Sequence, residues 1–544
     1  MPPPVQPDGL ESWKEIAAYL SRGVRTVRRW EREEGLPVHR HVHRKLGTVY
    51  AYKSEIDAWR RTRGSQSHAS VADAAAASQV KSIAVLPFEN LSTDPDNEYF
   101  ASGLTDEITA DLSKIRSLRV TSRTSAMTFR GSLKDVKKIA AELEVRYVLE
   151  GSVRWAGNRL RITAQLIDAA SDDHLWADTF EGTVDDVFAM QQRLAALIVD
   201  ALKLRLTADE ERRLVERTID NVHAYECYLR ARHEGWRWRK DSIDRAVRLL
   251  RDGLEIVGDN VRLHTALGLA YLQYREAGID LSDRPLVEAE ACAAKAAALE
   301  PGSAPTRQLR GWIHYSRGHI QDAVRDLKEA LALDPNNADT LLLLSNCYLI
   351  SGKVSLARPL LARLTSVDPL MPLARCLPGY ADLLEGNFAA AADPYRQMFE
   401  MDPSNPMARL FYAWVLLLNH RHGEAEAVAR SSSPEVHGSV PARVALFLSH
   451  ASAGEREHAV TLVTQDIEAV ATATDVFPRF LAHGYAIAGF PERAIDWLTI
   501  AVDRGFINYP FLSRYDPCFE ILKHRPRFHD LLDIVRERWQ RFEG

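Results

Sequence analysis

The sequence predicts a multidomain, mostly α-helical chain: a small N-terminal winged helix-turn-helix, a central α/β domain and a C-terminal α-solenoid of helix pairs. Three observations predict this fold class. Residues 12–63 are basic and have the apolar spacing of short helices. Residues 80–206 alternate short apolar strands with helical periodicity. From about residue 225 onward, proline, glycine and alanine recur every 34 residues.

The N-terminal segment has the spacing of two helices joined by a tight turn. Ser12 and Glu15 form a capping-box pattern, so a helix is expected to begin there. Residues 21–23 supply a short turn, and a second helix is expected to follow with Val27 on its apolar face. Helix-turn-helix motifs place their second helix, which has one packed face and one polar face, in the DNA major groove.

Charge supports nucleic-acid binding by the same segment. Residues 12–63 contain 13 Lys and Arg against 6 Asp and Glu, a net charge of +7, whereas the whole chain carries −5. This asymmetry indicates one nucleic-acid-binding end on an otherwise acidic protein. The alternative is that the outward arginines form only a solvated helix face.

Residues 36–52 predict a wing, in which 38–43 and 48–52 form two strands and 44–47 turn the chain. A third helix is expected from Ser54. The alternating His39, His41 and His43 share a strand face, but without a Cys or a close acidic ligand we expect no metal there. The predicted DNA contacts are Arg25, Thr26, Arg28, Arg29 and Arg32 of the second helix and His41, His43, Arg44 and Lys45 of the wing.

Residues 10–63 resemble the excisionase and MerR-like winged helix-turn-helix modules. The resemblance lies in SWKEIAAYL, VRTVRRWEREEGLPVHRH and VYAYKSEIDAW. It implies a DNA-binding function. The chain departs from the pattern at Ser21 and Gly23, where the family would have glycine in the turn and serine as the helix cap, and glycine caps a helix less well than serine.

Residues 64–79 are rich in Ser, Ala and Gly and predict a flexible linker. In the α/β domain, 82–88 and 118–120 are expected strands, and 147–154 and 159–168 are expected to form a hairpin around 156–158. Further elements are a strand at 174–180 and helices at 103–115, 133–143 and 184–206. The expected sheet is mixed, with helices on one or both faces.

This domain resembles the TolB-like amino-terminal domain, also called FlgO-like. The resemblance lies in IAVLPFENLS, EYFASGLTDEITADLS, YVLEGSVR and LRITAQLIDAASDDHLWADTF. It implies an accessory module, found beside cyclases, kinases or helix-turn-helix domains and before repeat arrays, without catalytic residues. The neighbouring carboxylates Asp106 and Glu107 point about 100° apart on a helix, so we interpret them as first-turn acids that favour the helix dipole.

After a connecting helix at 207–224, residues 225–508 form the repeat array and 509–544 a C-terminal cap. The period is carried by three sets of residues: Pro301, Pro335, Pro369 and Pro403; Gly318, Gly352 and Gly386; and Ala289, Ala323, Ala357, Ala391, Ala425 and Ala459. Small alanines allow two helices to cross closely, glycine ends the first helix of a pair, and proline stops the second.

This period, with Leu267, Gly268 and Tyr271 in L-G-x2-Y spacing, is typical of tetratricopeptide repeats, and about eight are expected. The resemblance implies a superhelix whose concave groove holds a peptide or a protein partner. The alternative is a structural spacer. Self-association is a further expectation, because specific DNA sites usually need two small modules.

Composition excludes several other classes. The five cysteines are scattered, as in a reducing compartment, and no apolar run is long enough to span a bilayer. No nucleotide-binding, zinc-protease or nucleophile-elbow motif is present, so we expect no enzyme, cofactor or metal. The sequence therefore predicts a cytoplasmic one-component transcriptional regulator that binds DNA and a protein partner or signal. The alternative is a repeat scaffold whose helix-turn-helix-like head binds no specific DNA.

Overall fold

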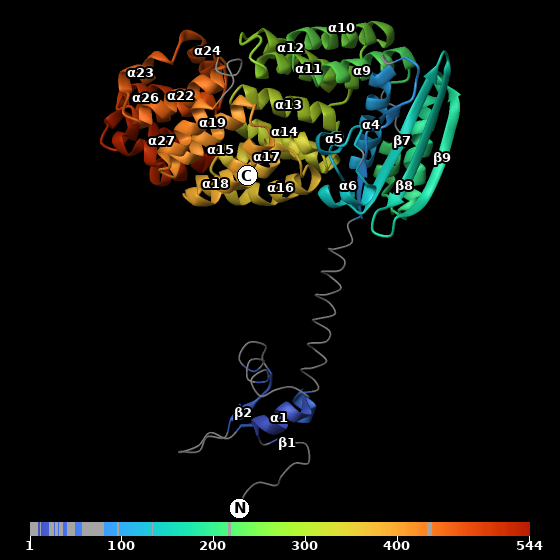
Figure 1. The fold of residues 1–544 in the computed structure, drawn as a ribbon, viewed down its shortest axis with the longest axis horizontal. Coiled ribbons are helices and arrows are strands. Elements are labelled where there is room, and N and C mark those ends of the chain that lie inside the picture. Colours follow the sequence, from blue (N-terminus) through green and yellow to red (C-terminus); the bar gives the residue numbers. More distant parts are fainter. Residues whose placement is uncertain are drawn as a thin grey trace, which may run out of the picture. The chain divides into compact units, whose positions relative to one another are not determined.

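The chain divides into two compact units, 1–80 and 81–544, in the computed structural model (Figure 1). Each unit is described by itself. The structure describes residues 9–10, 12–20, 27, 31, 36–40, 49–56, 81–94, 97–132, 134–215, 219–431 and 438–544.

The N-terminal unit contains a small antiparallel sheet and a helix. Its elements are β1 (Gly9–Leu10), α1 (Trp13–Tyr19), β2 (His39–Arg40) and β3 (Val49–Tyr52), and the sheet order is β1-β3-β2. The predicted cap is present, since Ser12 Oγ accepts a hydrogen bond from the Glu15 amide at 3.2 Å. The pairing of β2 with β3 agrees with the predicted wing strands, whereas β1 was not predicted. Positions 53–56 are helical, as expected for the start of a third helix.

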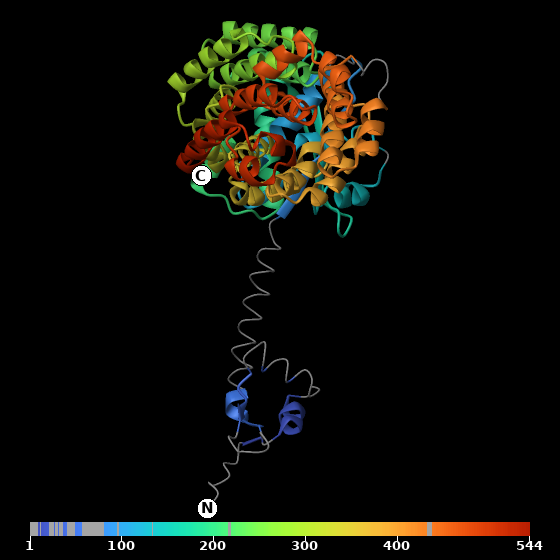
Figure 2. The ribbon, with the colours of Figure 1, turned by 90° about the vertical axis from the view of Figure 1, so that its left-hand side faces the viewer.

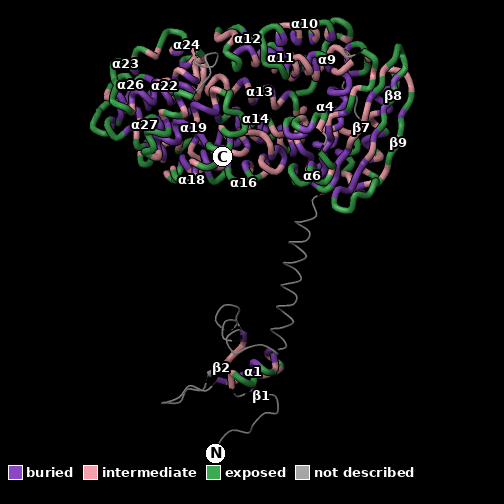
Figure 3. The backbone as a smooth tube through the Cα atoms, viewed as in Figure 1, coloured by how far each residue is buried: buried purple, intermediate pink, exposed green. Residues whose placement is uncertain are grey.

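A mixed sheet begins the second unit. Its strands are β4 (Lys81–Val85), β5 (Glu89–Asn90), β6 (Leu118–Val120), β7 (Tyr147–Ala156), β8 (Arg159–Asp168) and β9 (Asp173–Thr183). The order is β6-β4-β7-β8-β9, with β5 beside β7. β4 pairs in parallel with β6 and β7, while β7, β8 and β9 are antiparallel. β9 forms the far edge of the sheet and is mostly exposed (Figure 3).

Helices cover both faces of the parallel part of this sheet. They are α4 (Glu98–Ser113), α5 (Arg123–Met127), α6 (Val136–Glu142) and, after the short η2 (Val184–Asp186), α7 (Val187–Ala201) and α8 (Ala208–Val215). Ile83 and Val85 of β4 share a core with residues of α4 and α7. Ala84 between them faces the other way and packs with Ile139 and Ala140 of α6. The alternation of a strand therefore supplies two cores.

Eight helix pairs follow within the described residues. They are α9 (Val222–Gly235) with α10 (Lys240–Val257), α11 (Val261–Glu276) with α12 (Arg284–Leu299), α13 (Ala304–Ser316) with α14 (Ile320–Leu333), α15 (Ala338–Ile350) with α16 (Val354–Val367), α17 (Pro372–Leu384) with α18 (Phe388–Met401), α19 (Pro406–Leu418) with α20 (His422–Arg430), α22 (Val440–Ser452) with α23 (Arg456–Thr461), and α25 (Phe477–Ile487) with α26 (Pro491–Asp503). An extra helix, α24 (Gln465–Ala473), precedes α25, and η3 (Phe511–Tyr515), η4 (Pro517–Leu522) and α27 (Pro526–Arg541) end the unit.

The 34-residue period has the predicted physical basis. All six periodic alanines are fully buried, and each lies in the second helix of its pair. Each periodic proline stands two residues after the end of a second helix, as Pro335 does after Leu333. Gly318, Gly352 and Gly386 have φ of +79°, +67° and +87°, which glycine adopts without steric cost. One period later His420 occupies the same turn with φ +58°.

The sheet domain and the array are not separate bodies. One hydrophobic core contains Ile83 of β4, Leu104 of α4, Leu229 of α9 and Leu309 of α13. Residues 81–544 therefore fold around a shared interior. None of the helices in the described ranges combines the length and the apolar character needed to cross a bilayer.

Candidate functional site

The predicted DNA-contacting residues all lie outside the described residues: Arg25, Thr26, Arg28, Arg29, Arg32, His41, His43, Arg44 and Lys45. The core that supports them is partly described. Val27 of the second predicted helix is fully buried and packs with Ile16 of α1 and Ile56 after β3. One residue of the apolar face predicted for that helix is thus directed into the core of the module.

A histidine of the predicted wing has an acidic partner. His39 Nε2 lies 2.7 Å from Glu55 Oε2, and both side chains are 42% exposed. The ring of His39 stacks on Tyr50 at a centroid distance of 5.1 Å. The expectation that no acidic residue accompanies the alternating histidines was therefore wrong for His39. Its partner is supplied by the segment after β3, because β2 and β3 are adjacent in the sheet.

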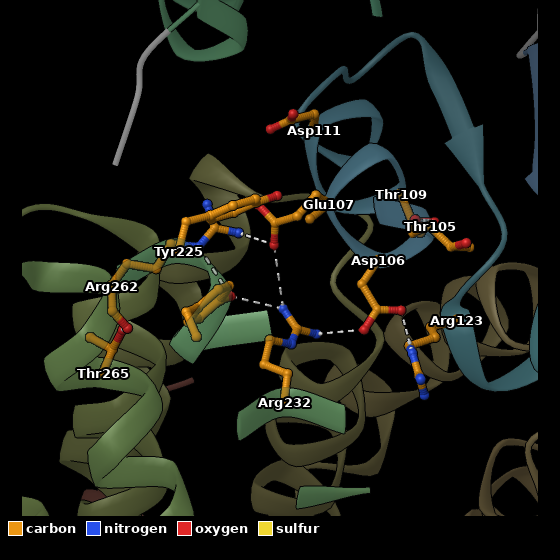
Figure 4. A network of polar contacts seen from close by, with 12 residues as sticks. Thr105, Asp106, Glu107, Thr109, Asp111, Arg123, Tyr225, Arg232, Arg262 and Thr265 are labelled. Atoms are coloured by element: carbon orange, nitrogen blue, oxygen red, sulfur yellow. Dashed lines mark hydrogen bonds and ion pairs between the residues drawn. The ribbon is translucent and has the colours of Figure 1, made fainter. Parts of the chain in front are cut away.

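A buried polar cluster joins the sheet domain to the array (Figure 4). We call it the polar junction: Asp106, Glu107, Arg123, Tyr228, Arg232 and Arg262. Two acids on α4 meet arginines of α9 and α11, the first helices of the first two repeats. Asp106 and Glu107 are each 5% exposed.

The pairs of the polar junction are specific. Arg262 Nη2 donates to Glu107 Oε1 at 2.6 Å, and its Nε donates to the Tyr228 hydroxyl at 3.0 Å. Arg232 donates to the same hydroxyl at 3.1 Å and lies 3.7 Å from Asp106. Asp106 also pairs with Arg123. Each acid therefore faces guanidinium groups, as a buried carboxylate requires.

Burial and pairing act in opposite directions on these groups. Burial raises the pKa of Glu107, against the charges of Arg262 and Arg232. Burial also raises the pKa of Asp106. The neighbouring tyrosine and carboxylates hold the pKa of Arg262 above its ordinary value, although burial alone would lower it. The arginines remain charged, so loss of either partner would leave a charge with little access to water.

The interpretation of Asp106 and Glu107 as first-turn acids was wrong. α4 begins at Glu98, five residues before the expected start, so both acids lie in the middle of the helix. Gly103 had suggested a helix boundary. A Cβ atom at Gly103 would lie 2.7 Å from Leu229 Cδ2 of α9, so this glycine permits close approach of two helices. Arg232 and Arg262 were not predicted, because they meet α4 only in the folded chain.

Loops of the array also bind the sheet domain. Asn336, which follows the periodic Pro335, donates its amide to the carbonyls of Ser113 and Leu118 at 3.0 and 2.9 Å. One repeat later, Asp368 accepts a hydrogen bond from Ser125 Oγ at 2.5 Å. The repeat period thus places polar loops in a row along the sheet domain.

The inner face of the array is partly occupied by its own last repeat. Tyr315 of α13 donates to Asp475 Oδ2 at 2.5 Å across 160 residues of sequence. Arg479 of α25 pairs with the Tyr380 hydroxyl of α17. Trp414 of α19 donates to His483 Nδ1 of α25 at 2.9 Å. First helices of distant repeats therefore meet, and α25 lies against the concave face between α13 and α19.

The C-terminal segment closes the array along the turns between paired helices. Asn508, 1% exposed, donates to the Leu349 carbonyl at 3.0 Å, and the Ile507 amide donates to the Ile350 carbonyl at 3.0 Å. A Cβ atom at Gly352 would lie 2.8 Å from Asn508 Oδ1. The later helices consequently pack against the earlier repeats (Figure 2).

A second buried polar group, His483, Asp516 and Cys518, is structural. His483 Nε2 bonds to Asp516 Oδ2 at 2.8 Å, while Nδ1 accepts from Trp414, so both ring nitrogens have partners. The Cys518 amide donates to the same Asp516 at 3.0 Å. This chain of hydrogen bonds ties α19, α25 and the C-terminal segment together.

Comparisons with known families agree with the regulator and repeat predictions at a coarse level. Residues 78–197 match the second domain of HilA/YgeH-like transcriptional regulators. Residues 314–375 and 379–433 match tetratricopeptide repeats. The chain thus contains a domain found in transcriptional regulators, followed by tetratricopeptide repeats. The winged helix-turn-helix and TolB-like resemblances stay predictions.

One curated relative is "Putative adenylate cyclase 3" of Rhizobium meliloti (strain 1021), 43% identical over 191 residues. The match covers 35% of this chain and spans 32% of the length of that relative. Two solved structures are similar in part. A tetratricopeptide repeat protein from Parabacteroides merdae has 14% identity, 51% and 99% coverage of the two chains and a TM-score of 0.34. A thermophilic tetratricopeptide repeat protein from Thermus thermophilus has 18% identity, 36% and 99% coverage and a TM-score of 0.30.

Proposed function

We propose that the protein is a cytoplasmic one-component transcriptional regulator. The N-terminal module binds DNA, and residues 81–544 sense a signal or bind a protein partner. The match of residues 78–197 to a domain of HilA/YgeH-like transcriptional regulators carries this proposal. The net charge of +7 on residues 12–63, on a chain of net charge −5, supports DNA as the ligand of the N-terminal module.

The buried position of Val27 supports a particular DNA-facing surface. Successive helical residues are about 100° apart. Because Val27 is directed into the core, we propose that Arg25, Arg29 and Arg32 lie on the opposite side of this predicted helix, with Thr26 and Arg28 flanking them. We propose that this face enters the major groove, while Arg44 and Lys45 of the wing contact phosphates, with His41 and His43 beside them.

The position of α25 limits where a protein partner binds. Between α13 and α19 the concave face is contacted by residues of the same chain, such as Arg479 and His483. We therefore propose that the partner binds another surface of the repeats. Self-association is also proposed, because two DNA-binding modules would then recognise one site.

No catalytic activity is proposed. The cyclase name belongs to a relative that matches this chain over about a third of the length of each. We propose that the shared segment is an accessory module in both proteins, as the TolB-like resemblance implies. The alternative function, a repeat scaffold whose head binds no specific DNA, makes a different prediction for the following experiment.

The test uses the full chain and duplex DNA selected from a random-sequence pool. Affinity is measured over a salt series for the wild type, for Arg28→Ala with Arg29→Ala, and for Arg44→Ala with Lys45→Ala. Each lost phosphate contact should lower the slope of log K against log salt by about one. Arg212→Ala with Arg541→Ala, side chains that are 73% and 79% exposed in the other unit, is the charge-matched control. The scaffold alternative would be favoured if the control changed DNA affinity as much as the variants of the N-terminal module do. It would also be favoured if no DNA sequence were enriched from the pool.

A further inference from the structure

Two histidines and an aspartate meet at the turn between α13 and α14. His314 lies in the last turn of α13, His319 immediately precedes α14, and Asp322 is in the first turn of α14. Gly318 turns the chain with φ +79°, and the His319 amide donates to the His314 carbonyl at 2.8 Å. Every repeat reverses the chain between its two helices. Here this reversal brings together the side chains of His314, His319 and Asp322, which are spread over nine residues of sequence.

These side chains have the chemistry and spacing of metal ligands. One ligand atom from each of the three lies within 4.8 Å of the other two. Tetrahedral Zn²⁺ with bonds near 2.1 Å holds its ligand atoms about 3.4 Å apart, so modest side-chain rotations complete the site. His319 is exposed and His314 and Asp322 are half-buried, which gives them room to rotate. Two imidazoles and one carboxylate form a ligand set that binds Zn²⁺ in preference to Mg²⁺ or Ca²⁺.

A fourth residue, an aspartate, lies close to the inner histidine. Asp326 is fully buried, and its Oδ2 lies 3.5 Å from His314 Nε2. Metal-binding histidines typically have such a carboxylate behind the ring, which fixes its orientation and increases its basicity.

Carboxylates pair with the arginines around this turn, and one of these carboxylates is Asp322 itself, whose Oδ1 lies 2.8 Å from Arg325 Nη2. A metal ion bound by Asp322 would share this carboxylate with Arg325. Arg310 lies 3.4 Å from Asp326 Oδ2. Arg317 pairs with Glu290 at 2.9 Å and with Asp283 at 3.4 Å.

The histidines also line an open cavity. It holds about 500 Å³ between α12 and α13, and its wall includes Ala293, Ala297, Ile313, His314 and His319. Three protein ligands leave one position of a tetrahedral ion unfilled, and water or a small anion would occupy it.

We propose that His314, His319 and Asp322 form a binding site for one divalent transition-metal ion of the Zn²⁺ type, with Asp326 as the residue that orients His314. The site differs from the expectation of no metal, and it does not depend on the proposed DNA binding. It lies beside the closure of the array, because a Cβ atom at Gly318 would be 2.8 Å from the Asp503 carbonyl. The bound ion should accordingly stabilise the closed array.

The test uses the full chain freed of metal by chelation. Zn²⁺ binding is measured by calorimetry, and Co²⁺ serves as a spectroscopic probe of a tetrahedral site. We expect the wild type to bind one ion that raises the midpoint of thermal unfolding. His319→Ala, an exposed substitution that should not impair folding, is expected to abolish the Co²⁺ bands and to weaken Zn²⁺ binding at least about tenfold. Asp322→Asn should weaken it in the same direction.

Two controls separate this site from other histidines. His420→Ala with His422→Ala removes another pair on the array, whose rings are 6.2 Å apart. His41→Ala with His43→Ala removes the alternating pair of the predicted wing. Retention of the ion by both controls and its loss in His319→Ala would support the proposal. Undiminished binding by His319→Ala, loss in either control, or no stoichiometric Zn²⁺ binding by the wild type would overturn it.

Discussion

Glu107 and Arg262 form an ion pair that is almost completely removed from water. Their side chains are 7% and 18% exposed, and the Tyr228 hydroxyl accepts a further hydrogen bond from the arginine. Such a pair contributes little net stability when complete, since desolvation offsets the attraction of its charges. We expect the pair to contribute mainly to specificity, because α4 docks on α9 and α11 where the acids meet the arginines.

The first prediction concerns this pair. Arg262→Ala leaves Glu107 buried without its principal partner and should reduce the free energy of unfolding by about 3–5 kcal/mol. Urea denaturation of the full chain, followed by circular dichroism, measures the change. The matched control is Arg536→Ala, which removes an exposed pair with Asp533 and should cost less than about 1 kcal/mol.

A double variant tests the physical reason. Glu107→Leu with Arg262→Met removes both charges and keeps the volume, so it should be more stable than Arg262→Ala alone. If the double variant is the less stable protein, packing of the arginine and not its charge dominates the polar junction.

At the scale of elements, the repeat period was predictable and the contacts between distant elements were not. Ala323 and Pro335 recur because each helix pair has the same local geometry, so their roles follow from spacing alone. The start of α4 was misplaced because Gly103 serves a contact with Leu229, 126 residues later. The occupied concave face was missed for the same reason, since Tyr315 and Asp475 are far apart in sequence.

The second prediction separates the two functions of a turn glycine. Gly352 and Gly454 occupy the same position three periods apart, with φ of +67° and +80°. Alanine at either position should reduce the free energy of unfolding by about 1–2 kcal/mol, because alanine adopts the left-handed conformation less readily than glycine. At Gly352 its Cβ would also lie 2.8 Å from Asn508 Oδ1, whereas nothing lies within 4 Å at Gly454. Gly352→Ala should therefore cost about 1–3 kcal/mol more than Gly454→Ala.

The measurement is the urea midpoint of each full-length variant. Proteolysis of the C-terminal segment gives a second readout, and it should become faster in Gly352→Ala alone. Equal destabilisation by the two substitutions would contradict this prediction. It would mean that the close approach of Asn508 to residue 352 adds nothing to the destabilisation caused by the left-handed backbone conformation.

At the scale of the molecule, residues 81–544 form one folded body in which the sheet domain and the array share a core. Three kinds of contact hold the sheet domain to the array: the apolar core, the polar junction and the loops that carry Asn336 and Asp368. The composition of residues 64–79 predicts a linker before this body. Under the proposed function, a signal received by the array would change the orientation or assembly of the whole body without unfolding the sheet domain.

The last prediction follows from this shared core. Limited digestion of the full chain with a protease of broad specificity should first cut between residues 64 and 80 and leave a resistant fragment that corresponds to 81–544, identified by mass spectrometry. The sheet domain should not be released, because its separation would expose Asp106, Glu107 and the apolar side of α4. Arg262→Ala should make a cut between the sheet domain and the array faster, since the polar junction is then incomplete. A first cut of the wild type between α8 and α9 would show that the two parts are independent domains, and the signal would then have to pass through a second hinge.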